Sequence, residues 1–210
     1  MRRFEPTLHE LHFRSKPVGG PVEQDKRTLR AETRRSRRSH STREREALTE
    51  GLTQNLVSVV RAHEPALVAC YLSTPDEPNT RPFLEWAVGH SVDVLLPVSR
   101  PDGQLNWVFN HAGTEKVGLY GIAERAGEPV PNSVIESVDL MIIPAAAVDK
   151  SGVRLGWGKG YYDRTLAQLT HEPPIFAVVY DGELRERIPR EDHDRPVGGV
   201  VTPTQILTFG

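Results

Sequence analysis

Cysteine is almost absent from this sequence, since Cys70 is the single one in 210 residues. A lone cysteine excludes an internal disulfide, which fits a reducing compartment. No apolar run approaches the length of a membrane span, and the first residues lack the apolar core of a signal peptide. Because Glu5 and Glu10 also argue against a transit peptide, we expect a cytoplasmic protein that does not associate with membranes.

Several common catalytic motifs are also missing. The sequence contains no G-x-S-x-G, no pair of histidines at metal-binding spacing and no internal repeat. The net charge is −2 and the hydrophobic content is 38%, which is ordinary for a soluble domain. The length favours one domain with a substantial core. We expect a poorly ordered N-terminal arm over residues 1–22 and a single domain over residues 23–210.

Apolar runs that alternate with helical patterns predict the fold. Buried strands are expected over residues 66–72, 92–97, 138–144, 175–180 and 198–202, with a short antiparallel strand over 105–109. Helices are expected over residues 25–38, 41–60, 82–88, 161–169 and 181–188. This order predicts a three-layer, Rossmann-like α/β fold in which helices flank a largely parallel central sheet.

Local signals add detail to this prediction. Ser41 and Glu44 form a capping box that opens the second helix, and Thr80 is the expected N-cap of the third. Residues 110–137 are rich in glycine and proline and predict a surface segment that covers a cleft. Within that segment Tyr120 is expected to be an ordinary packed aromatic, although stacking on a flat ligand is an alternative. Cys70 is expected to be a small core residue.

The most informative stretch alternates glycine with larger residues between a predicted strand and a predicted helix. It reads Arg154, Leu155, Gly156, Trp157, Gly158, Lys159, Gly160, Tyr161, Tyr162, Asp163 and Arg164. Glycines at every second position let backbone N–H groups turn toward one point, and the next helix directs its positive end there. The stretch matches neither the Walker pattern nor G-x-G-x-x-G. It predicts a phosphate-binding loop, and a flexible turn is the alternative.

Charged residues in the same stretch support anion binding. Arg154 and Lys159 are expected to supply mobile cations, and Asp163 in the first helical turn is a candidate ligand for a magnesium ion that bridges to phosphate. Farther along the chain, an acidic turn offers Asp192 or Asp194 as a further oxygen ligand. We expect His193 only to shape that turn, because a hard cation does not favour imidazole.

The basic helix over residues 25–38 has three interpretations. Its arginines could bind the phosphates of a nucleic acid, or they could form a solvated face, which is the usual role of charge runs. Alternatively, Lys26 and Arg30 lie four residues apart and could reach into a cleft together to bind an oligophosphate. The segment alone does not decide among these. Glu77, in the loop after the first strand, is a candidate ligand-binding carboxylate, and an exposed loop acid is the alternative.

Together these residues resemble the 5-formyltetrahydrofolate cyclo-ligase family, also called the 5,10-methenyltetrahydrofolate synthetases. The resemblance covers residues 24–203, and its strongest mark is residues 154–163, which are similar to the family pattern R-L-G-x-G-x-G-Y-Y-D. Supporting marks are residues 26–30, 71–80 and 120–124, and Pro189 followed by Asp194. The resemblance implies conversion of 5-formyltetrahydrofolate to 5,10-methenyltetrahydrofolate with ATP and Mg²⁺, through phosphorylation of the formyl oxygen and release of ADP and phosphate.

The resemblance also implies a role for each matching residue. The residues implied in catalysis are Lys159, Arg154 and Tyr161. Contacts with ATP are implied for Lys26, Arg27, Thr28, Leu29, Arg30, Arg154, Leu155, Gly156, Trp157, Gly158, Lys159, Gly160, Tyr161 and Tyr162. Contacts with the folate are implied for Arg30, Leu72, Glu77, Trp157, Gly158, Lys159, Gly160 and Tyr161. The implied metal ligands are Asp163 and Asp194. We expect a monomer without a nucleic-acid partner.

The sequence departs from the usual family pattern at a few positions. The loop over residues 145–148 lacks the common glycine and phenylalanine, Arg125 replaces a common proline, Gly198 stands where an aspartate is frequent, and Trp157 replaces a tyrosine or arginine. These departures do not involve the phosphate or metal positions, so the reaction class is expected to be retained. A non-catalytic folate- or nucleotide-binding relative of the same fold is the alternative.

Overall fold

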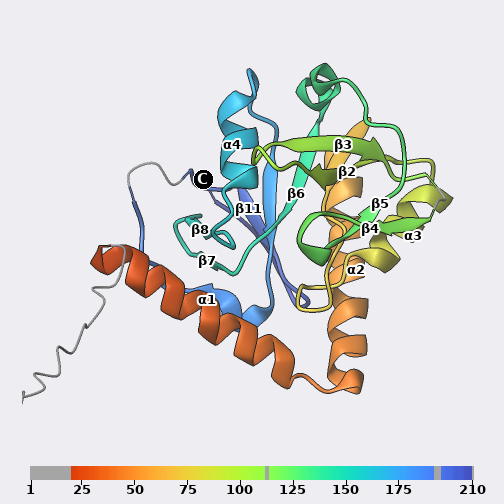
Figure 1. Ribbon diagram of the computed structural model, residues 1–210. Helices are drawn as coiled ribbons and strands as arrows, with labels where there is room; N and C mark the ends of the chain where they lie inside the picture. Colours follow the sequence, from red (N-terminus) through yellow and green to blue (C-terminus); the bar gives the residue numbers. More distant parts are fainter. Residues whose placement is uncertain (1–19, 112–113, 192–194, 210) are drawn as a thin grey trace, which may run out of the picture.

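The computed structural model describes residues 20–111, 114–191 and 195–209 of the chain. Within these ranges the strands form a central sheet of seven strands, a small sheet of three strands and a separate two-stranded hairpin (Figure 1). None of the helices in this part of the chain is long and apolar enough to cross a membrane. Of the predicted N-terminal arm, residues 1–19 lie outside the described residues, and the first helix already begins at Pro21.

The central sheet is mostly parallel and has the strand order β12-β11-β9-β6-β1-β2-β3. Its five inner strands run parallel to one another, whereas the edge strands β3 and β12 pair antiparallel with their neighbours. The strands are β1 (Leu67–Cys70), β2 (Asp93–Ser99), β3 (Leu105–Phe109), β6 (Leu140–Pro144), β9 (Ile175–Val178), β11 (Gly199–Val201) and β12 (Ile206–Thr208). The prediction of a largely parallel sheet is therefore confirmed.

Helices cover both faces of the central sheet. One face carries α2 (Thr42–His63) and α3 (Arg81–Gly89), and the other carries α4 (Tyr161–Gln168) and the 3₁₀ helix η2 (Asn132–Ser137). Successive side chains of a strand point to opposite faces, so Leu140 and Ile142 of β6 join the first core cluster while Met141 and Ile143 join the second. All four are fully buried, which stabilises the fold by about 1.5–3 kcal/mol each. The expected three-layer architecture is present.

The helix α1 (Pro21–Ser39) packs on the small sheet (Figure 1). This sheet consists of β10 (Leu184–Arg185), β7 (Ala147–Asp149) and β8 (Arg154–Leu155). Ala147 and Leu155 of this sheet belong to a third apolar cluster, against which Leu29 of α1 packs. The hydroxyl of Thr33 also donates to the carbonyl of Ala146 at 3.3 Å. These contacts hold the basic helix beside the glycine-rich stretch.

The helix expected over residues 181–188 is absent. Instead, the chain makes one 3₁₀ turn, η3 (Asp181–Glu183), and then extends into β10, which pairs in parallel with β7. The carboxylate of Glu183 accepts a hydrogen bond from the amide of Tyr180 at 2.8 Å, which caps the start of this turn. Pairing with β7 then outweighs the local helical preference of this segment.

Three further features were not predicted. A hairpin of β7 and β8 follows β6, and its second strand consists of Arg154 and Leu155, the first two residues of the glycine-rich stretch. The segment over residues 110–137 contains the hairpin of β4 (Glu115–Val117) and β5 (Ala123–Arg125), joined through η1 (Leu119–Gly121). Finally, β11 is not the last strand, because β12 follows it and pairs antiparallel.

The two predicted helix starts differ in outcome. Ser41 and Glu44 form the expected capping box: the amide of Ser41 donates to Glu44 at 2.7 Å, and the amide of Glu44 donates to Ser41 at 3.3 Å. Thr80 occupies the N-cap position of α3, but its side chain does not cap the helix. Its hydroxyl donates instead to the carbonyl of Tyr71 at 2.8 Å, which ties the start of α3 to the end of β1.

Candidate active site

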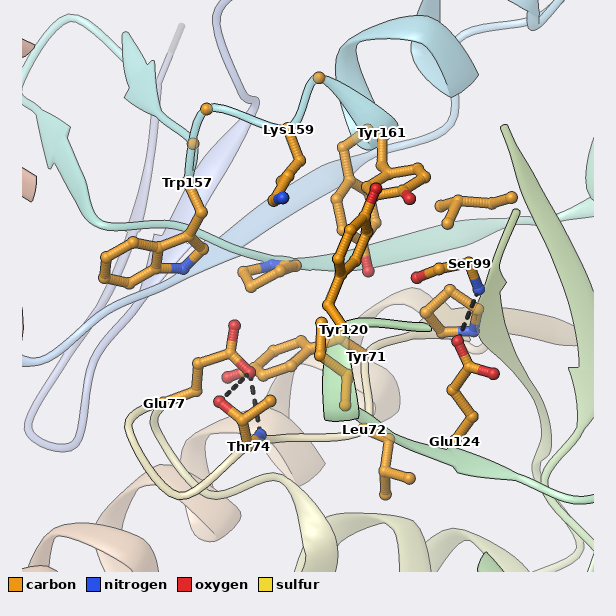
Figure 2. A pocket seen from close by; sticks show the side chains of 18 of the residues that line it. Tyr71, Leu72, Thr74, Glu77, Ser99, Tyr120, Glu124, Trp157, Lys159 and Tyr161 are labelled. Atoms are coloured by element: carbon orange, nitrogen blue, oxygen red, sulfur yellow. Dashed lines mark hydrogen bonds between the residues drawn. The ribbon is translucent and has the colours of Figure 1, made fainter. Parts of the chain in front are cut away.

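One cleft lies at the carboxyl ends of β1, β2 and β6. Along the chain, β1 is followed by its neighbour β2 on one side and later by β6 on the other, and ligands of open α/β sheets bind where the strand order reverses in this way. The residues that line the cleft are Tyr71, Leu72, Thr74, Glu77, Pro97, Ser99, Leu105, Tyr120, Ile122, Ala123, Glu124, Pro144, Arg154, Gly156, Trp157, Gly158, Lys159, Gly160, Tyr161, Tyr162 and Asp163. The loop after β1, the β4–β5 hairpin and the glycine-rich stretch therefore face one space (Figure 2).

The backbone over residues 156–160, which we call the glycine ribbon, requires glycine at two positions. Gly158 and Gly160 have φ values of +84° and +69°, in the left-handed region that side chains rarely adopt. A Cβ atom at Gly160 would also lie 2.6 Å from Nη1 of Arg164. The ribbon leads directly into α4, and the first amides of a helix have no partner within the helix. This arrangement offers backbone donors to an anion.

Arg154 is fixed rather than mobile. Its side chain is 5% exposed, forms an ion pair with the carboxylate of Asp163, and donates to the carbonyl of Pro144 at 3.4 Å. The prediction of a mobile cation at this position is therefore wrong, because β8 places Arg154 beneath the ribbon instead of in a free loop. Asp163 is 64% exposed at its side chain and lines the cleft, so it remains accessible from solvent.

Lys159 is the exposed cation of the ribbon. Its Nζ lies 3.8 Å from the ring centroid of Tyr120, which comes from the turn between β4 and β5 (Figure 2). Tyr120 is 60% exposed and has a φ of +61°, an uncommon value for a residue with a side chain. The expectation of an ordinary packed aromatic is therefore wrong: tertiary structure places this ring on the wall of the cleft.

The basic helix α1 reaches the ribbon through Arg30. Its Nε donates to the carbonyl of Gly156 at 2.9 Å, and its Nη1 pairs with Glu23 at the same distance. Lys26 lies one turn earlier and is 4% exposed, with Nζ 2.7 Å from the carboxylate of Glu191. Lys26 and Arg30 therefore share one face of the helix as expected, but neither lines the cleft, and their binding of an oligophosphate stays a prediction.

The residues between them make other contacts. Arg27 and Thr28 are exposed and, like Lys26 and Arg30, lie outside the residues that line the cleft. The hydroxyl of Thr28 donates to the carbonyl of Gln24 at 3.0 Å, and the guanidinium of Arg27 donates to the Gln24 side chain. Leu29 packs against the cluster of the small sheet. The binding roles implied for these three residues stay predictions.

Glu77 faces the cleft from the wall opposite the ribbon (Figure 2). One carboxylate oxygen accepts hydrogen bonds from the amide and the hydroxyl of Thr74, at 2.9 and 3.0 Å. Burial raises the pKa of Glu77, while the bonds from Thr74 and the charge of Arg37 act in the opposite direction. Leu72, the other predicted folate contact from this region, is buried and lines the same cleft.

Three polar groups of the cleft have features that the sequence did not predict. Glu124 is 4% exposed and accepts a hydrogen bond from the amide of Ser99 at 2.8 Å. In the sequence, the only indication of its importance was that it belongs to residues 120–124, which resemble the family. The hydroxyl of Tyr162 and Nε1 of Trp157 are buried, and among the described residues neither has a hydrogen-bond partner. Burial raises the pKa of Tyr162 far above its ordinary value, so its hydroxyl stays protonated and can donate to a ligand.

The two predicted metal ligands differ in what the structure describes. Asp194 lies outside the described residues, as do Asp192 and His193 of the predicted acidic turn. Asp163 lies at the cleft. In the part of the chain that the structure covers, no group of three or more His, Cys, Asp or Glu side chains is gathered around a metal-sized space.

Comparison with known proteins gives a consistent result. The profile of the 5-formyltetrahydrofolate cyclo-ligase family matches residues 22–203. A 5-formyltetrahydrofolate cyclo-ligase of Mycolicibacterium smegmatis is 37% identical over 141 residues, which cover 65% of this chain and 73% of that protein. The Escherichia coli protein of the same name is 36% identical over 155 residues, which cover 70% of this chain and 82% of that protein.

Solved structures give the same result for the fold. The NMR structure of an Aquifex aeolicus 5,10-methenyltetrahydrofolate synthetase is 30% identical, covers 87% of this chain and 92% of that one, and superposes with a TM-score of 0.74. A Mycoplasma pneumoniae 5,10-methenyltetrahydrofolate synthetase is 22% identical, with a TM-score of 0.68 over 85% of this chain and 99% of that one. At that lower identity the second structure supports the fold alone.

Proposed function

This chain belongs to the 5-formyltetrahydrofolate cyclo-ligase family and is a ligase, and we propose that it uses ATP and Mg²⁺ to convert 5-formyltetrahydrofolate to 5,10-methenyltetrahydrofolate. ADP and phosphate are the other products. The observation that carries the proposal is the apposition of two different walls in one cleft: the glycine ribbon with Lys159 on one side, and Glu77 on the other. One wall suits a phosphate chain and the other suits a pterin.

The proposed chemistry needs two steps. The formyl oxygen first attacks the γ-phosphorus of ATP, so that an O–P bond forms and the bond to the ADP oxygen breaks. The N10 nitrogen of the folate then attacks the activated formyl carbon, the C–O bond breaks, and phosphate leaves with that oxygen. N10 loses its proton as the ring closes. A formyl oxygen is a poor leaving group until it is phosphorylated, which explains why ATP is consumed.

The phosphate side would be formed by the ribbon and its neighbours. Amides of the ribbon and of the first turn of α4 are suited to phosphate oxygens. Lys159 is exposed at this point and can leave the Tyr120 ring to bind an anion. Arg30 holds the carbonyl of Gly156 at 2.9 Å and thereby fixes the ribbon from behind. Positioning and charge stabilisation would therefore supply most of the catalysis.

The folate side would be formed around Glu77. An ionised carboxylate can accept two parallel hydrogen bonds from the amino-pyrimidine edge of a pterin. Thr74 fixes one of its oxygens through the amide and the hydroxyl, which orients the side chain toward the cleft. The rings of Trp157 and Tyr161 line the same space, and the hydroxyl of Tyr161 is engaged with the carbonyl of Arg100, to which it donates at 3.1 Å. Tyr161 would therefore act through its ring, as a wall for the substrate.

The residues present fit a magnesium ion at the phosphate side. Asp163 supplies a hard oxygen ligand that is exposed and lines the cleft, and a magnesium ion usually takes only one or two carboxylates from a protein. Asp163, with Asp194 as the second proposed ligand, would hold the ion, and phosphate oxygens and water would complete its coordination. When bound, Mg²⁺ neutralises charge on the phosphate chain. The ion pair with Arg154 orients the Asp163 carboxylate.

The proposal is tested by following product formation. The methenyl product absorbs in the near ultraviolet, so purified protein with 5-formyltetrahydrofolate, ATP and Mg²⁺ should raise that absorbance and release ADP in equal amount. Reactions without ATP, and reactions with a chelator of Mg²⁺, are the controls and should show no rise. Binding of both ligands without formation of ADP would contradict the proposed reaction.

We also propose that the protein acts as a cytoplasmic monomer without a nucleic-acid partner. The buried thiol of Cys70 suits a reducing compartment, and residues of one chain line the candidate cleft. Size-exclusion chromatography with light scattering should give the mass of one chain. RNA binding that falls steeply with salt would instead favour a nucleic-acid role for the exposed arginines of α1.

A further inference from the structure

Arg37 of α1 is fully buried and lies outside the residues that line the cleft, yet it contacts segments that follow three parallel strands. Its Nη1 donates to the carbonyl of Asp76, after β1, at 3.2 Å. Its Nη2 donates to the carbonyl of Ala145, after β6, at 2.8 Å. Two bonds of 2.7 Å join the guanidinium to the carboxylate of Glu183, after β9. One side chain therefore connects three loops at the carboxyl edge of the central sheet.

The pairing explains why a charge can be buried here. A buried guanidinium is costly unless its donors are satisfied and its charge is compensated. The bidentate pair with Glu183 provides both, and Glu183 is itself 4% exposed and accepts the amide of Tyr180 at 2.8 Å. Arg37 and Glu183 are 146 positions apart in the chain, so the pair fixes tertiary geometry rather than a local turn.

Arg37 supports two walls of the cleft from behind. Asp76, whose carbonyl it holds, immediately precedes Glu77 in the loop after β1. On its other side, the ring of Trp157 in the glycine ribbon lies 5.0 Å from the Arg37 guanidinium carbon. Both Glu77 and Trp157 line the cleft. Arg37 therefore contacts the surroundings of both side chains proposed to face the folate, and Arg34 lies over the same Trp157 ring at 4.9 Å.

We propose that Arg37, fixed by Glu183, is a positioning residue for the folate side of the cleft, where it sets the Glu77 loop and the Trp157 ring without touching the substrate. The proposal rests on the folate-facing roles of Glu77 and Trp157 given above. Two further arginines also hold this loop: Arg38 pairs with the carboxylate of Asp76, and Arg45 donates to the carbonyl of Pro75. Loss of Arg37 should therefore displace the loop without unfolding it.

Electrostatics agree with this geometry. Burial raises the pKa of Glu77 and the neighbouring charge of Asp76 acts in the same direction, while the positive charge of Arg37 acts against them and favours the ionised carboxylate. Thr74 acts in the same direction as Arg37 through its two hydrogen bonds. Tyr71 and Tyr162 also interact with Glu77, and both stay neutral because burial raises the pKa of each far above its ordinary value.

The test compares steady-state constants in a matched set of variants. The double variant Arg37→Met/Glu183→Gln removes both charges, so no lone charge is left buried. We expect the KM for 5-formyltetrahydrofolate to rise about 10- to 100-fold, with the KM for ATP changed by less than about twofold. Arg37→Lys retains the charge but loses the bidentate geometry, and should raise the folate KM by a smaller factor. Arg35→Met, on an exposed position of the same helix, is the control and should match the wild type.

Each outcome decides the proposal. An unchanged folate KM in a cooperatively folded double variant overturns it, and so does an equal rise in both KM values, which would indicate general loosening. If the double variant does not fold, the Arg37→Lys variant is the test. An unchanged KM for 5-formyltetrahydrofolate in that variant would overturn the proposal. If the wild type forms no methenyl product, the proposed function fails, and Arg37 is then judged from the calorimetric Kd for 5-formyltetrahydrofolate in the same variants.

Discussion

The ammonium group of Lys159 lies 3.8 Å from the ring centroid of Tyr120, so a cation of the glycine ribbon faces an aromatic ring of the β4–β5 hairpin. Such a contact at an exposed site stabilises by about 0.5–1 kcal/mol. A phosphate group attracts the same ammonium more strongly, because the interaction is then between full charges. Lys159 is therefore held over the cleft by a weak contact that a bound anion can replace.

Replacement of Lys159 should affect catalysis and leave folding intact. Lys159→Ala is expected to lower kcat/KM for ATP by about 100-fold, because one charge is lost where the transferred phosphoryl group would lie. Stability should change by less than about 0.5 kcal/mol, since the side chain is exposed. Initial rates from the absorbance assay and thermal melts measure the two effects.

The control for this variant is Lys150→Ala. Lys150 is also an exposed lysine, 61% at its side chain, and it pairs with Glu186 outside the cleft lining. Its removal should leave both rate and melting temperature near those of the wild type. Equal rates in the wild type and in Lys159→Ala would remove Lys159 from the catalytic residues.

Asp163 should control the requirement for magnesium. Asp163→Asn retains the shape of the side chain and removes the charge, so the Mg²⁺ concentration for half-maximal rate should rise about tenfold or more. The variant also leaves the buried Arg154 guanidinium without its counter-charge, so stability should fall by about 1–3 kcal/mol even though asparagine retains one acceptor oxygen. A magnesium titration at saturating ATP and folate measures the first effect. An unchanged titration curve would show that Asp163 is not a metal ligand.

The backbone of the ribbon can be tested without a change of charge. Gly160→Ala places a Cβ atom at a φ of +69°, within 2.6 Å of the Arg164 guanidinium. This strain should lower stability by about 1–2 kcal/mol and raise the KM for ATP, because the ribbon must shift. Gly182→Ala is the control, since a Cβ atom there meets nothing within 4 Å. Melting curves and ATP kinetics of both variants give the comparison, and a KM for ATP equal in the two would contradict the role of the ribbon.

The sequence predicts the parts of the fold whose signals are local. The apolar run over residues 138–144 becomes β6, and the capping box at Ser41 and Glu44 begins α2. The small sheet was missed because β7, β8 and β10 are only two or three residues long, too short to show a period. These strands form because they pair with other segments of the chain, and a local sequence pattern does not predict such pairing.

The same distinction applies to the site. Glycine spacing and the loop position of Glu77 indicated two walls of the cleft, and both walls are present. The burial of Arg154 and the exposure of Tyr120 were missed because each follows from an unpredicted hairpin. The pair of Arg37 and Glu183 had no sequence signal, since its partners come from opposite ends of the domain and one lies in a segment with a wrongly predicted helix.

Glu77→Gln should weaken folate binding while it stabilises the fold. Burial raises the pKa of Glu77, so the folded protein binds a proton there at a higher pH than the unfolded chain does. The folded state is therefore favoured at low pH, and this contribution is lost as the pH rises through the raised pKa. Near neutral pH the glutamine variant avoids that cost and should melt at a higher temperature than the wild type.

Two measurements separate these effects. The gain in melting temperature should disappear below the ordinary pKa range of a glutamate, where the carboxyl is protonated in both states. The KM for 5-formyltetrahydrofolate should rise about 10- to 100-fold at neutral pH, because a charge-assisted bond to the substrate is lost. In the wild type the same KM should rise as the pH falls through the raised pKa of Glu77, whereas in the variant it should not follow that titration. The control is Glu85→Gln, at an exposed position on α3, which should behave as the wild type does. An identical pH profile of KM in the wild type and in Glu77→Gln would show that Glu77 does not bind the folate.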